Sequence, residues 1–464
     1  MKSKLIAPLS LAAAVAALFS LQIEMASSQL SSTAQDPGVR GGPAGAGGPI
    51  TGLTARQSAF FTEGKTDFEE VEVVADGLGP RMNLDSCAGC HAQPATGGTS
   101  PLVNPQVTFA SKDGGTDTVP FFITPNGPVR EARFKFNADA TRDGGVHNTA
   151  TITGRTGAAG CVLAQPDFAT QVANNNLIFR IPTPVFGAGL IEQIPDSVIL
   201  ANQAANASTK KSLGIAGHPN LVVSGRAITG STNNNGNDGT IARFGWKAQN
   251  QTLLLFSGEA YNVEMGISNE LFQQEREQNP NCQFATLPND VTDTETKFTP
   301  AGLNAIEKFA FFQRFLAPPT PSPDTPGGAT SISNGRSQFV STGCALCHTP
   351  TLTTSNSTVA ALKNQSANLF SDLLVHAMGP GLADNIVQGG AQGDEFRTAP
   401  LWGLGQRIFF LHDGRTTNLV EAIQAHQSAG DGTFGPSEAN AVIDNFNRLP
   451  EGKKQDLLNF LRSL

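Results

Sequence analysis

The chain has 464 residues, of which 39% are hydrophobic and 15% are charged, and its formal net charge is −8. This length is sufficient for two or three domains with ordinary hydrophobic cores. No block of basic residues occurs, which argues against nucleic acid as a partner. The 49 glycines and 29 prolines indicate many turns and irregular loops.

The first 28 residues have the layout of a secretory signal peptide. Lys2 and Lys4 precede an apolar run rich in Ala and Leu, and small residues follow between Ser20 and Ser28. An uncleaved membrane anchor is the alternative, although the apolar run is only marginally long enough to cross a bilayer. We therefore expect a periplasmic or otherwise exported protein with no transmembrane segment once the signal is removed.

Residues 29–56 lack apolar periodicity and are rich in Gly and Pro. They predict a flexible leader before the first helix-rich region. Helical spacing begins near residue 57 and leads into "SCAGCHAQP", residues 86–94.

Between residues 101 and 240, the β-prone runs "PQVTFAS", "VPFFITP" and "NLIFRIPTPVF" alternate with Gly, Asn and Pro clusters. This alternation indicates strands joined by long loops.

A Pro-rich segment divides the chain. The spacing predicts a helix over residues 300–316, and "APPTPSPDTPGG", residues 317–328, cannot continue it and is typical of an interdomain linker. We therefore expect an N-terminal domain at 57–316, with a β/loop-rich insertion at about 101–240, and a C-terminal domain at 329–464.

The C-terminal domain has the plan of a small c-type cytochrome. A predicted helix over "SNGRSQFV" leads into a second motif, "TGCALCHTP". A closing helix has Pro450 in its first turn and places Leu457, Leu458 and Leu461 on one face. The predicted fold class is therefore mainly α, with two cytochrome c-like domains and a β/loop-rich insertion in the first.

Two copies of Cys-x-x-Cys-His indicate covalent haem attachment. Two cysteines three residues apart can form thioethers with the two vinyl groups of one haem, and the following His supplies an iron ligand. A zinc site would need about four ligands from one cluster, and a redox dithiol has no use for the fixed His. The sequence therefore predicts two covalently bound haem c groups. The attachment and ligand residues are Cys87, Cys90 and His91 for the first haem, and Cys344, Cys347 and His348 for the second.

Two cysteines remain outside the motifs. In an oxidising compartment such a pair is more often bonded than free. We therefore expect a structural disulfide between Cys161 and Cys282.

The stretch "EFRTAPLWGLGQRIFFLHDGRTTNLVEAIQAH", residues 395–426, resembles the C-terminal haem segment of the bacterial di-haem cytochrome c peroxidase superfamily. In that superfamily the distal ligand is usually a Met, fourteen residues after the His of His-Asp-Gly. The same offset from His412 reaches His426. The resemblance thus implies His348 and His426 as the two ligands of the second iron, which gives a lower potential than His/Met ligation. The alternative for His426 is an exposed His at the end of a helix.

A second stretch, residues 243–268, resembles the peroxidatic segment of the same superfamily. Its "VEM" implies that Glu264 moves a proton on the distal side of the first haem. The Gln that accompanies this Glu in the peroxidases is Ala260 here, which puts peroxidase activity in doubt. Met265 offers two alternatives, because it could close the first iron as its sixth ligand or be a core residue beside a surface Glu.

Several short motifs narrow the resemblance to a branch. The stretches "FGAGLIEQIPDS", "ARFGWKA", "EMGIS", "APLWGLG" and "FLHDGR" resemble the di-haem oxidoreductase family, also described as thiol oxidoreductases, over about residues 57–464. The resemblance implies that electrons pass through the C-terminal haem to a reactive N-terminal haem with peroxidase-like chemistry. It also implies a small redox protein or small molecule as electron donor or acceptor, and a peroxide or thiol as substrate. The alternative is an electron-transfer cytochrome with both irons six-coordinate and no substrate.

The matched segments contain further candidates. Trp246, Phe244 and Trp402 could assist electron transfer or pack in the core. His412 and Arg415 could hydrogen-bond haem propionates, since Arg binds carboxylates well.

Related peroxidases also hold a calcium ion between their domains. A Thr-x-Pro segment supplies carbonyl ligands to that ion. The matching stretch "RTAP" contains Thr398 and Pro400. The resemblance thus implies calcium as an additional cofactor.

Overall fold

The computed structural model describes residues 33–142, 145–221, 227–228, 231–232, 241–274, 277, 279–284 and 299–464. The predicted signal peptide, the start of the leader and several parts of the predicted insertion lie outside these residues. Among the described residues, we find no helix whose length and apolar character would allow it to cross a membrane.

The described chain is rich in helices, and most of them are short. The helices before the Pro-rich segment are α2 (Ala55–Glu69), α3 (Cys87–Cys90), α4 (Gln106–Phe109), α5 (Phe168–Ala173), α6 (Ala188–Glu192), α7 (Asp196–Ala204), α8 (Ala207–Ser212), α9 (Leu253–Met265) and α10 (Ala305–Phe315). The later helices are α11 (Gly328–Thr342), α12 (Leu419–Gln424), α13 (Asn440–Asn447) and α14 (Glu451–Ser463). Turns of 3-10 helix are η1 (Val74–Asp76), η2 (Lys112–Gly114), η3 (Pro280–Cys282), η4 (Pro300–Gly302), η5 (Cys344–Leu346), η6 (Ala360–Leu362) and η7 (Leu404–Gln406).

The sheets are small and antiparallel. The three-stranded sheet has the order β3 (Val146–His147), β2 (Glu131–Phe134), β5 (Leu177–Arg180). The two-stranded pairs are β1 (Arg81–Met82) with β4 (Ala150–Thr151), β6 (Asn220–Leu221) with β9 (Ile241–Ala242), β7 (Ala227–Ile228) with β8 (Ser231–Thr232), β10 (Leu352–Thr353) with β11 (Ser366–Ala367), and β12 (Val375–Ala377) with β13 (Glu395–Arg397).

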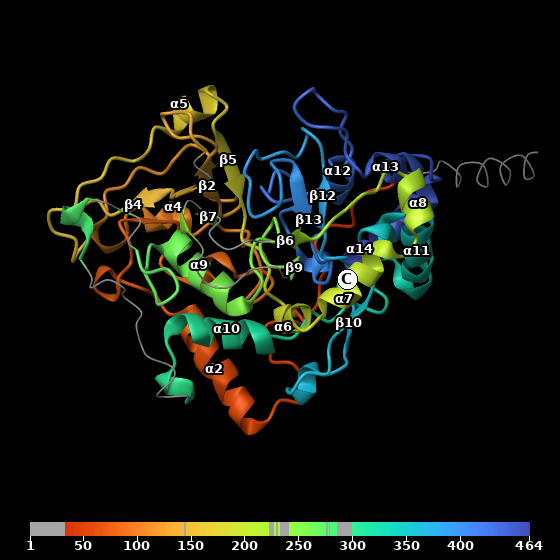
Figure 1. Cartoon of the computed structure of the whole chain (residues 1–464), viewed down its shortest axis with the longest axis horizontal. Coiled ribbons are helices and arrows are strands. Elements are labelled where there is room, and N and C mark those ends of the chain that lie inside the picture. The colour runs from red at the N-terminus through yellow and green to blue at the C-terminus, as the bar shows by residue number, and fades with distance from the viewer. Residues whose placement is uncertain are drawn as a thin grey trace, which may run out of the picture.

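Helices α2 and α10 pack side by side (Figure 1), and α2 also contacts α3, which carries the first motif. They approach closely at Gly64, where a Cβ would lie 2.1 Å from the carbonyl oxygen of Lys308. Phe60 and Phe311 stack across the helix pair, with ring centroids 4.6 Å apart. The predicted helix at 300–316 begins later than expected, because Asn304 caps α10 through the backbone N–H of the third residue that follows it.

Helices α11 and α14 form the matching pair (Figure 1), and α11 also contacts η5, which lies in the second motif. Both predicted helices are present, and Pro450 is the residue that precedes α14 rather than part of its first turn. The predicted apolar face of α14 is confirmed, because Leu457, Leu458 and Leu461 are buried. The two helices again meet at a glycine: a Cβ at Gly335 would lie 1.9 Å from the carbonyl oxygen of Asp456.

Replacing Gly335 with Ala should destabilise the protein by about 1–3 kcal/mol, because the added methyl overpacks the crossing of α11 and α14. Its close neighbour is a backbone oxygen, which cannot rotate away as a side chain can. Thermal or denaturant unfolding would measure the change. Gly452→Ala is the matched control, because a Cβ there meets nothing within 4 Å and should stabilise α14 by about 0.5–1 kcal/mol.

The predicted insertion contains helices as well as strands. "NLIFRIPTPVF" provides β5, as its β-prone residues predict. "PQVTFAS" instead forms α4, and "VPFFITP" forms turns, so the strands predicted there are wrong. The reason is local for α4: the side chain of Asn104 accepts the backbone N–H of Gln106 and donates to the Pro128 carbonyl, which holds a turn in place of a strand.

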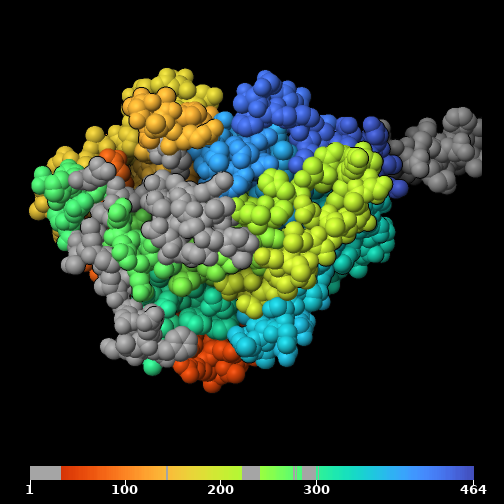
Figure 2. All heavy atoms as spheres, in the orientation of Figure 1, coloured from red at the N-terminus to blue at the C-terminus, as the bar shows by residue number. Residues whose placement is uncertain are grey.

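Helices α7 and α8 lie against the C-terminal part of the chain. Figure 2 shows them as the yellow-green surface that runs across to the blue residues. One hydrophobic cluster joins Ile194 and Ile199 to Leu352 and Leu362. The segment before the Pro-rich linker therefore shares a core with residues that follow it. The domain boundaries stay a prediction.

Residues 33–54, which we call the N-terminal strap, are held by contacts along their length. The carboxylate of Asp36 lies 2.6 Å from the guanidinium of Arg462, and both side chains are buried. Backbone N–H groups of Ala317 and Thr320 donate to carbonyls of the strap at 3.0 and 2.9 Å. The strap is therefore not the flexible leader that the sequence predicts. Low apolar periodicity gave no sign of these contacts, many of which are hydrogen bonds and one of which is a buried ion pair.

Cys161 and Cys282 form a disulfide, as the sequence predicts. Both residues are buried, and the bond joins the loop after β4 to the 3-10 turn η3.

Candidate functional site

The first Cys-x-x-Cys-His motif opens onto a cavity. Cys87 and Cys90 lie one turn apart on α3, and His91 ends that helix. All three line the cavity. The Nδ1 of His91 donates to the carbonyl of Gly98 at 3.0 Å, because a carbonyl oxygen can only accept. The proton is therefore on Nδ1, which leaves the lone pair of Nε2 free to bind a metal.

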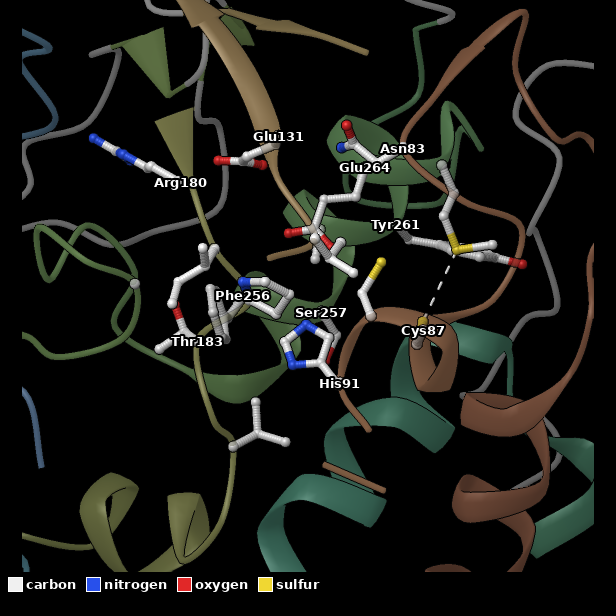
Figure 3. A pocket seen from close by; sticks show the side chains of 18 of the residues that line it. Asn83, Cys87, His91, Glu131, Arg180, Thr183, Phe256, Ser257, Tyr261 and Glu264 are labelled. Carbon is white, nitrogen blue, oxygen red and sulfur yellow. Dashed lines mark hydrogen bonds between the residues drawn. The ribbon is translucent and has the colours of Figure 1, made fainter. Parts of the chain in front are cut away.

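Two carboxylates lie on the opposite side of this cavity from His91 (Figure 3). Glu264 is near the end of α9, and Glu131 begins β2. Burial, with the nearby charge of Glu131, raises the pKa of Glu264 to about 8. The Nε of Arg133 donates to Glu131 at 2.7 Å. Ala260 lines the same cavity and adds no polar group. Glu264 can therefore hold a proton near neutral pH.

Met265 faces the attachment cysteines. Its Sδ lies 3.9 Å from the Sγ of Cys87, and its side chain is buried in the core around α2 and α10. The thioether thus contacts a cysteine sulfur, whereas the carboxylates of Glu264 and Glu131 lie across the cavity.

The second motif lines a separate, mostly apolar cavity. Gly343 ends α11 in a left-handed conformation, which turns the chain into the motif. The Nδ1 of His348 donates to the carbonyl of Phe370 at 3.1 Å. The Nδ1 of His426 donates to the carbonyl of Ala422 at 2.8 Å. Each imidazole is therefore left with an Nε2 lone pair, and both line the same cavity.

Burial favours the neutral form of His348 and His426. It lowers the pKa of His348 to about 4, with a smaller contribution from His426, and it also lowers the pKa of His426. Neutral imidazole is the form that binds metals. Two neutral imidazoles are thus available to a metal group in one cavity.

The two predicted propionate partners differ in position. His412 lines the second cavity and stacks on Phe396, with ring centroids 4.3 Å apart. Arg415 does not line it. Its guanidinium is bound to Asp413 at 2.7 Å and its side chain is 40% exposed, so the expectation for Arg415 is corrected.

Trp246 lines both cavities. Its indole N–H donates to the carbonyl of Ile181 at 3.0 Å, which fixes the ring between the two sites. Phe244 and Trp402 belong instead to a hydrophobic cluster and line a smaller cleft next to both cavities.

A buried ion cluster lies close to Trp246. Asp384 accepts from Arg180 at 2.6 Å and lies 3.0 Å from the Nζ of Lys247. Burial would raise the pKa of Asp384, but the charges of Lys247 and Arg180 outweigh it and lower the pKa to about 2. These residues join β5, the turn after β9 and the loop before β13.

Within the described part of the chain, one group of three side chains could hold a metal ion: Cys347, Asp372 and His376. Cys347 belongs to the second motif, and His376 already bridges Asp372 at 3.0 Å and Glu438 at 2.7 Å. Thr398, the expected calcium ligand, lies outside this group, and its carbonyl accepts from Ser371. Calcium binding stays a prediction.

The profile of the family described as "Di-haem oxidoreductase, putative peroxidase" matches residues 169–464. The chain belongs to the di-haem oxidoreductase family. Membership implies haem as the cofactor of this oxidoreductase, and it agrees with the helix-rich architecture and small sheets. No curated protein matches the chain.

Solved structures similar to this di-haem oxidoreductase are distant. A hydrazine synthase chain from Kuenenia stuttgartiensis is 19% identical, with a TM-score of 0.23, and the match covers 37% of this chain and 60% of that one. The diheme peroxidase BthA of Burkholderia thailandensis is 16% identical, with a TM-score of 0.29 and coverage of 48% and 65%. A MauG-like protein associated with microbial copper homeostasis is 18% identical, with a TM-score of 0.29 and coverage of 61% and 90%. These low scores add nothing to the family assignment.

The donor sets of both cavities fit haem. Each cavity brings together two cysteine sulfurs and an imidazole with a free Nε2, and the second adds the imidazole of His426. The structure also adds cavity residues of this di-haem oxidoreductase that the sequence did not reveal. Glu131 is the clearest, because it lies 133 residues before Glu264 and no motif marks it.

Proposed function

We propose that this di-haem oxidoreductase binds one haem c in each cavity and reduces peroxide at the N-terminal one. Bound haem would supply the redox chemistry and the open metal position. Cys87, Cys90 and His91 would hold the first haem, and Cys344, Cys347, His348 and His426 the second. The observation that carries the proposal is the asymmetry of the cavities: the second is lined by the imidazole of His426 as well as that of His348, and the first has carboxylates opposite His91.

The residues of the first cavity would manage protons. Glu264 would accept a proton from a bound peroxide and return it to the leaving oxygen. Its raised pKa suits this role, because a group that titrates near the working pH can both take and release a proton. The charge of Glu131 favours the protonated form of Glu264, and Arg133 holds Glu131 in place.

The second cavity would receive electrons from a small redox protein or a small-molecule donor. A pair of imidazoles favours a closed, low-potential site that transfers electrons without binding substrate. Trp246 lines both cavities and would lie on the route between them. We propose export to the periplasm, two cytochrome c-like domains joined at 317–328, and covalent attachment as parts of the same hypothesis.

The spectrum of the ferric protein tests the proposal. Pyridine haemochrome should show two covalent haems per chain. In the half-reduced protein, a high-spin ferric signal should shift when cyanide or peroxide is added, because one iron lies open beside Glu264. Two haems without such a signal in either the oxidised or the half-reduced protein would favour the alternative, an electron-transfer cytochrome with both irons capped. The contact between Met265 and Cys87 favours the open site.

His426→Ala should convert the second haem from low spin to high spin and raise its potential, because the variant removes one of two strong nitrogen ligands. Electron paramagnetic resonance of the oxidised protein would measure the loss of the low-spin signal. His218→Ala is the matched control, because His218 pairs with Glu395 outside both cavities. An unchanged low-spin signal in His426→Ala would remove His426 from the ligand set.

A further inference from the structure

Among the residues that the structure describes, Arg397 and Arg407 are buried cations without an acidic partner. Arg397 lies on β13 and Arg407 follows the 3-10 turn η7. They are only 6% and 8% exposed. The Nε of Arg397 donates to the carbonyl of Gly245 at 3.0 Å. Across the described residues, neither guanidinium has a carboxylate within ion-pair distance.

Other buried arginines of the chain do form ion pairs. Each of the following has a carboxylate partner within 2.8 Å: Arg133 with Glu131, Arg155 with Asp117, Arg180 with Asp384, and Arg462 with Asp36. Removing a charge from water without a partner costs several kcal/mol, so buried charges are normally paired. Two such guanidinium groups in one place therefore indicate a binding site for an anion that the described residues do not supply.

Both guanidinium groups belong to the second cavity. Arg397 and Arg407 line it together with His348 and His426, and they also line the adjacent cleft that Trp246 shares. Burial, with the neighbouring charge of Arg407, lowers the pKa of Arg397 to about 10, so both remain charged at neutral pH. Among the described residues of the lining, the single acidic side chain is Glu438, and it is hydrogen-bonded to His376.

We propose that Arg397 and Arg407 bind the two propionate carboxylates of the C-terminal haem. This inference rests on the proposed function, since it requires a haem at Cys344 and Cys347. Two cations match two carboxylates in number. A guanidinium also presents paired N–H groups to a carboxylate, which makes arginine well suited to fix its orientation. Arg397 and Arg407 take the role that the sequence suggested for Arg415. The guanidinium of Arg415 is instead bound to Asp413.

The two arginines would also raise the reduction potential of the second haem. Two positive charges beside the porphyrin favour the reduced state, which carries one more electron, and they keep the propionates ionised. Both arginines also line the cleft that Trp246 shares with the first cavity, so the residues that would bind the propionates lie on the side of the second cavity next to the first. The attachment cysteines and the arginines would then both hold the haem in this cavity.

The test uses the full-length holoprotein with Arg397→Gln and Arg407→Gln, separately and together, and Arg415→Gln as the matched control. Pyridine haemochrome first counts the haems in each protein. Spectroelectrochemical titration then follows the two haems, and resonance Raman spectroscopy follows the propionate bending bands. We expect two haems per chain, a lower midpoint potential of the C-terminal haem alone, and shifted propionate bands. Arg415→Gln should show neither change.

Lysine variants keep the inference testable if a Gln variant does not fold. Arg397→Lys and Arg407→Lys retain the charge but lose the paired N–H groups, so the potential should fall less than in the Gln variants while the Raman bands still shift. Unchanged potentials and bands in folded variants with two haems would overturn the inference. A shift confined to the N-terminal haem would also overturn it. Wild-type protein with no covalent haem would instead contradict the proposed function.

Discussion

Replacing Glu264 with Gln is expected to slow peroxide reduction by about 10²- to 10⁴-fold, while both haems stay bound. Gln has nearly the shape of Glu but cannot accept and return a proton. Glu264 faces the first cavity across from His91, and Ala260 beside it provides no substitute. Stopped-flow measurement of peroxide consumption by the reduced protein would give the rate, and pyridine haemochrome would give the haem content.

The pH profile provides a second readout of the same variant. Burial and the charge of Glu131 raise the pKa of Glu264 to about 8. If the ionised form accepts the proton from peroxide, the wild-type rate should increase as the pH rises through that value, and Glu264→Gln should lose this increase. Glu270→Gln is the matched control, because Glu270 does not line the cavity and is not among the groups that shift the pKa of Glu264. An unchanged rate in Glu264→Gln would exclude it from the mechanism.

Asp384→Asn should destabilise the protein by about 3–5 kcal/mol, because it leaves two buried cations without their shared anion. Arg180 and Lys247 both bind this carboxylate, and all three side chains are nearly inaccessible to solvent. Denaturant unfolding at neutral pH would measure the loss. Glu69→Gln, at an exposed pair with Lys65, should leave the free energy of unfolding almost unchanged.

The effect of Asp384→Asn should depend on pH in a defined direction. The pKa of Asp384 is lowered in the folded protein from 3.8 to about 2, because the charges of Lys247 and Arg180 outweigh burial. Its stabilisation is therefore complete above the ordinary pKa and is lost as the pH falls through the folded value. The difference between wild type and variant should shrink between pH 4 and pH 2. A constant difference over that interval would contradict the assigned ion cluster.

The sequence predicts those parts of the candidate sites that depend on local spacing. Cys-x-x-Cys-His brings two sulfurs and an imidazole together within one turn, and the structure places each copy at a cavity. The offset from His412 to His426 could be read because both lie in one short segment, and His426 does line the cavity of His348. Which of these side chains bind iron is still a prediction.

The rest of the sites depends on contacts between distant segments. Glu131 comes to the first cavity on β2, and its position depends on pairing with β5, more than forty residues later. Arg397 and Arg407 are ordinary arginines in the sequence, and only their burial without an acid distinguishes them. Strand propensity also gave a wrong prediction at "PQVTFAS", because the side chain of Asn104 holds a turn there in place of a strand. Tertiary contacts override such weak local preferences.

The N-terminal strap runs beside the Pro-rich linker, with hydrogen bonds from Ala317 and Thr320, and continues to Arg462 in the last helix. Two stretches of polypeptide therefore connect the regions around the two motifs. A protease that cleaves once between residues 317 and 328 would leave the fragments attached, and they would separate only under denaturing conditions. The core shared by α7 and residues 352–362 would also hold the fragments together, so a comparison of wild type with Asp36→Asn in native gels after limited digestion would isolate the contribution of the strap.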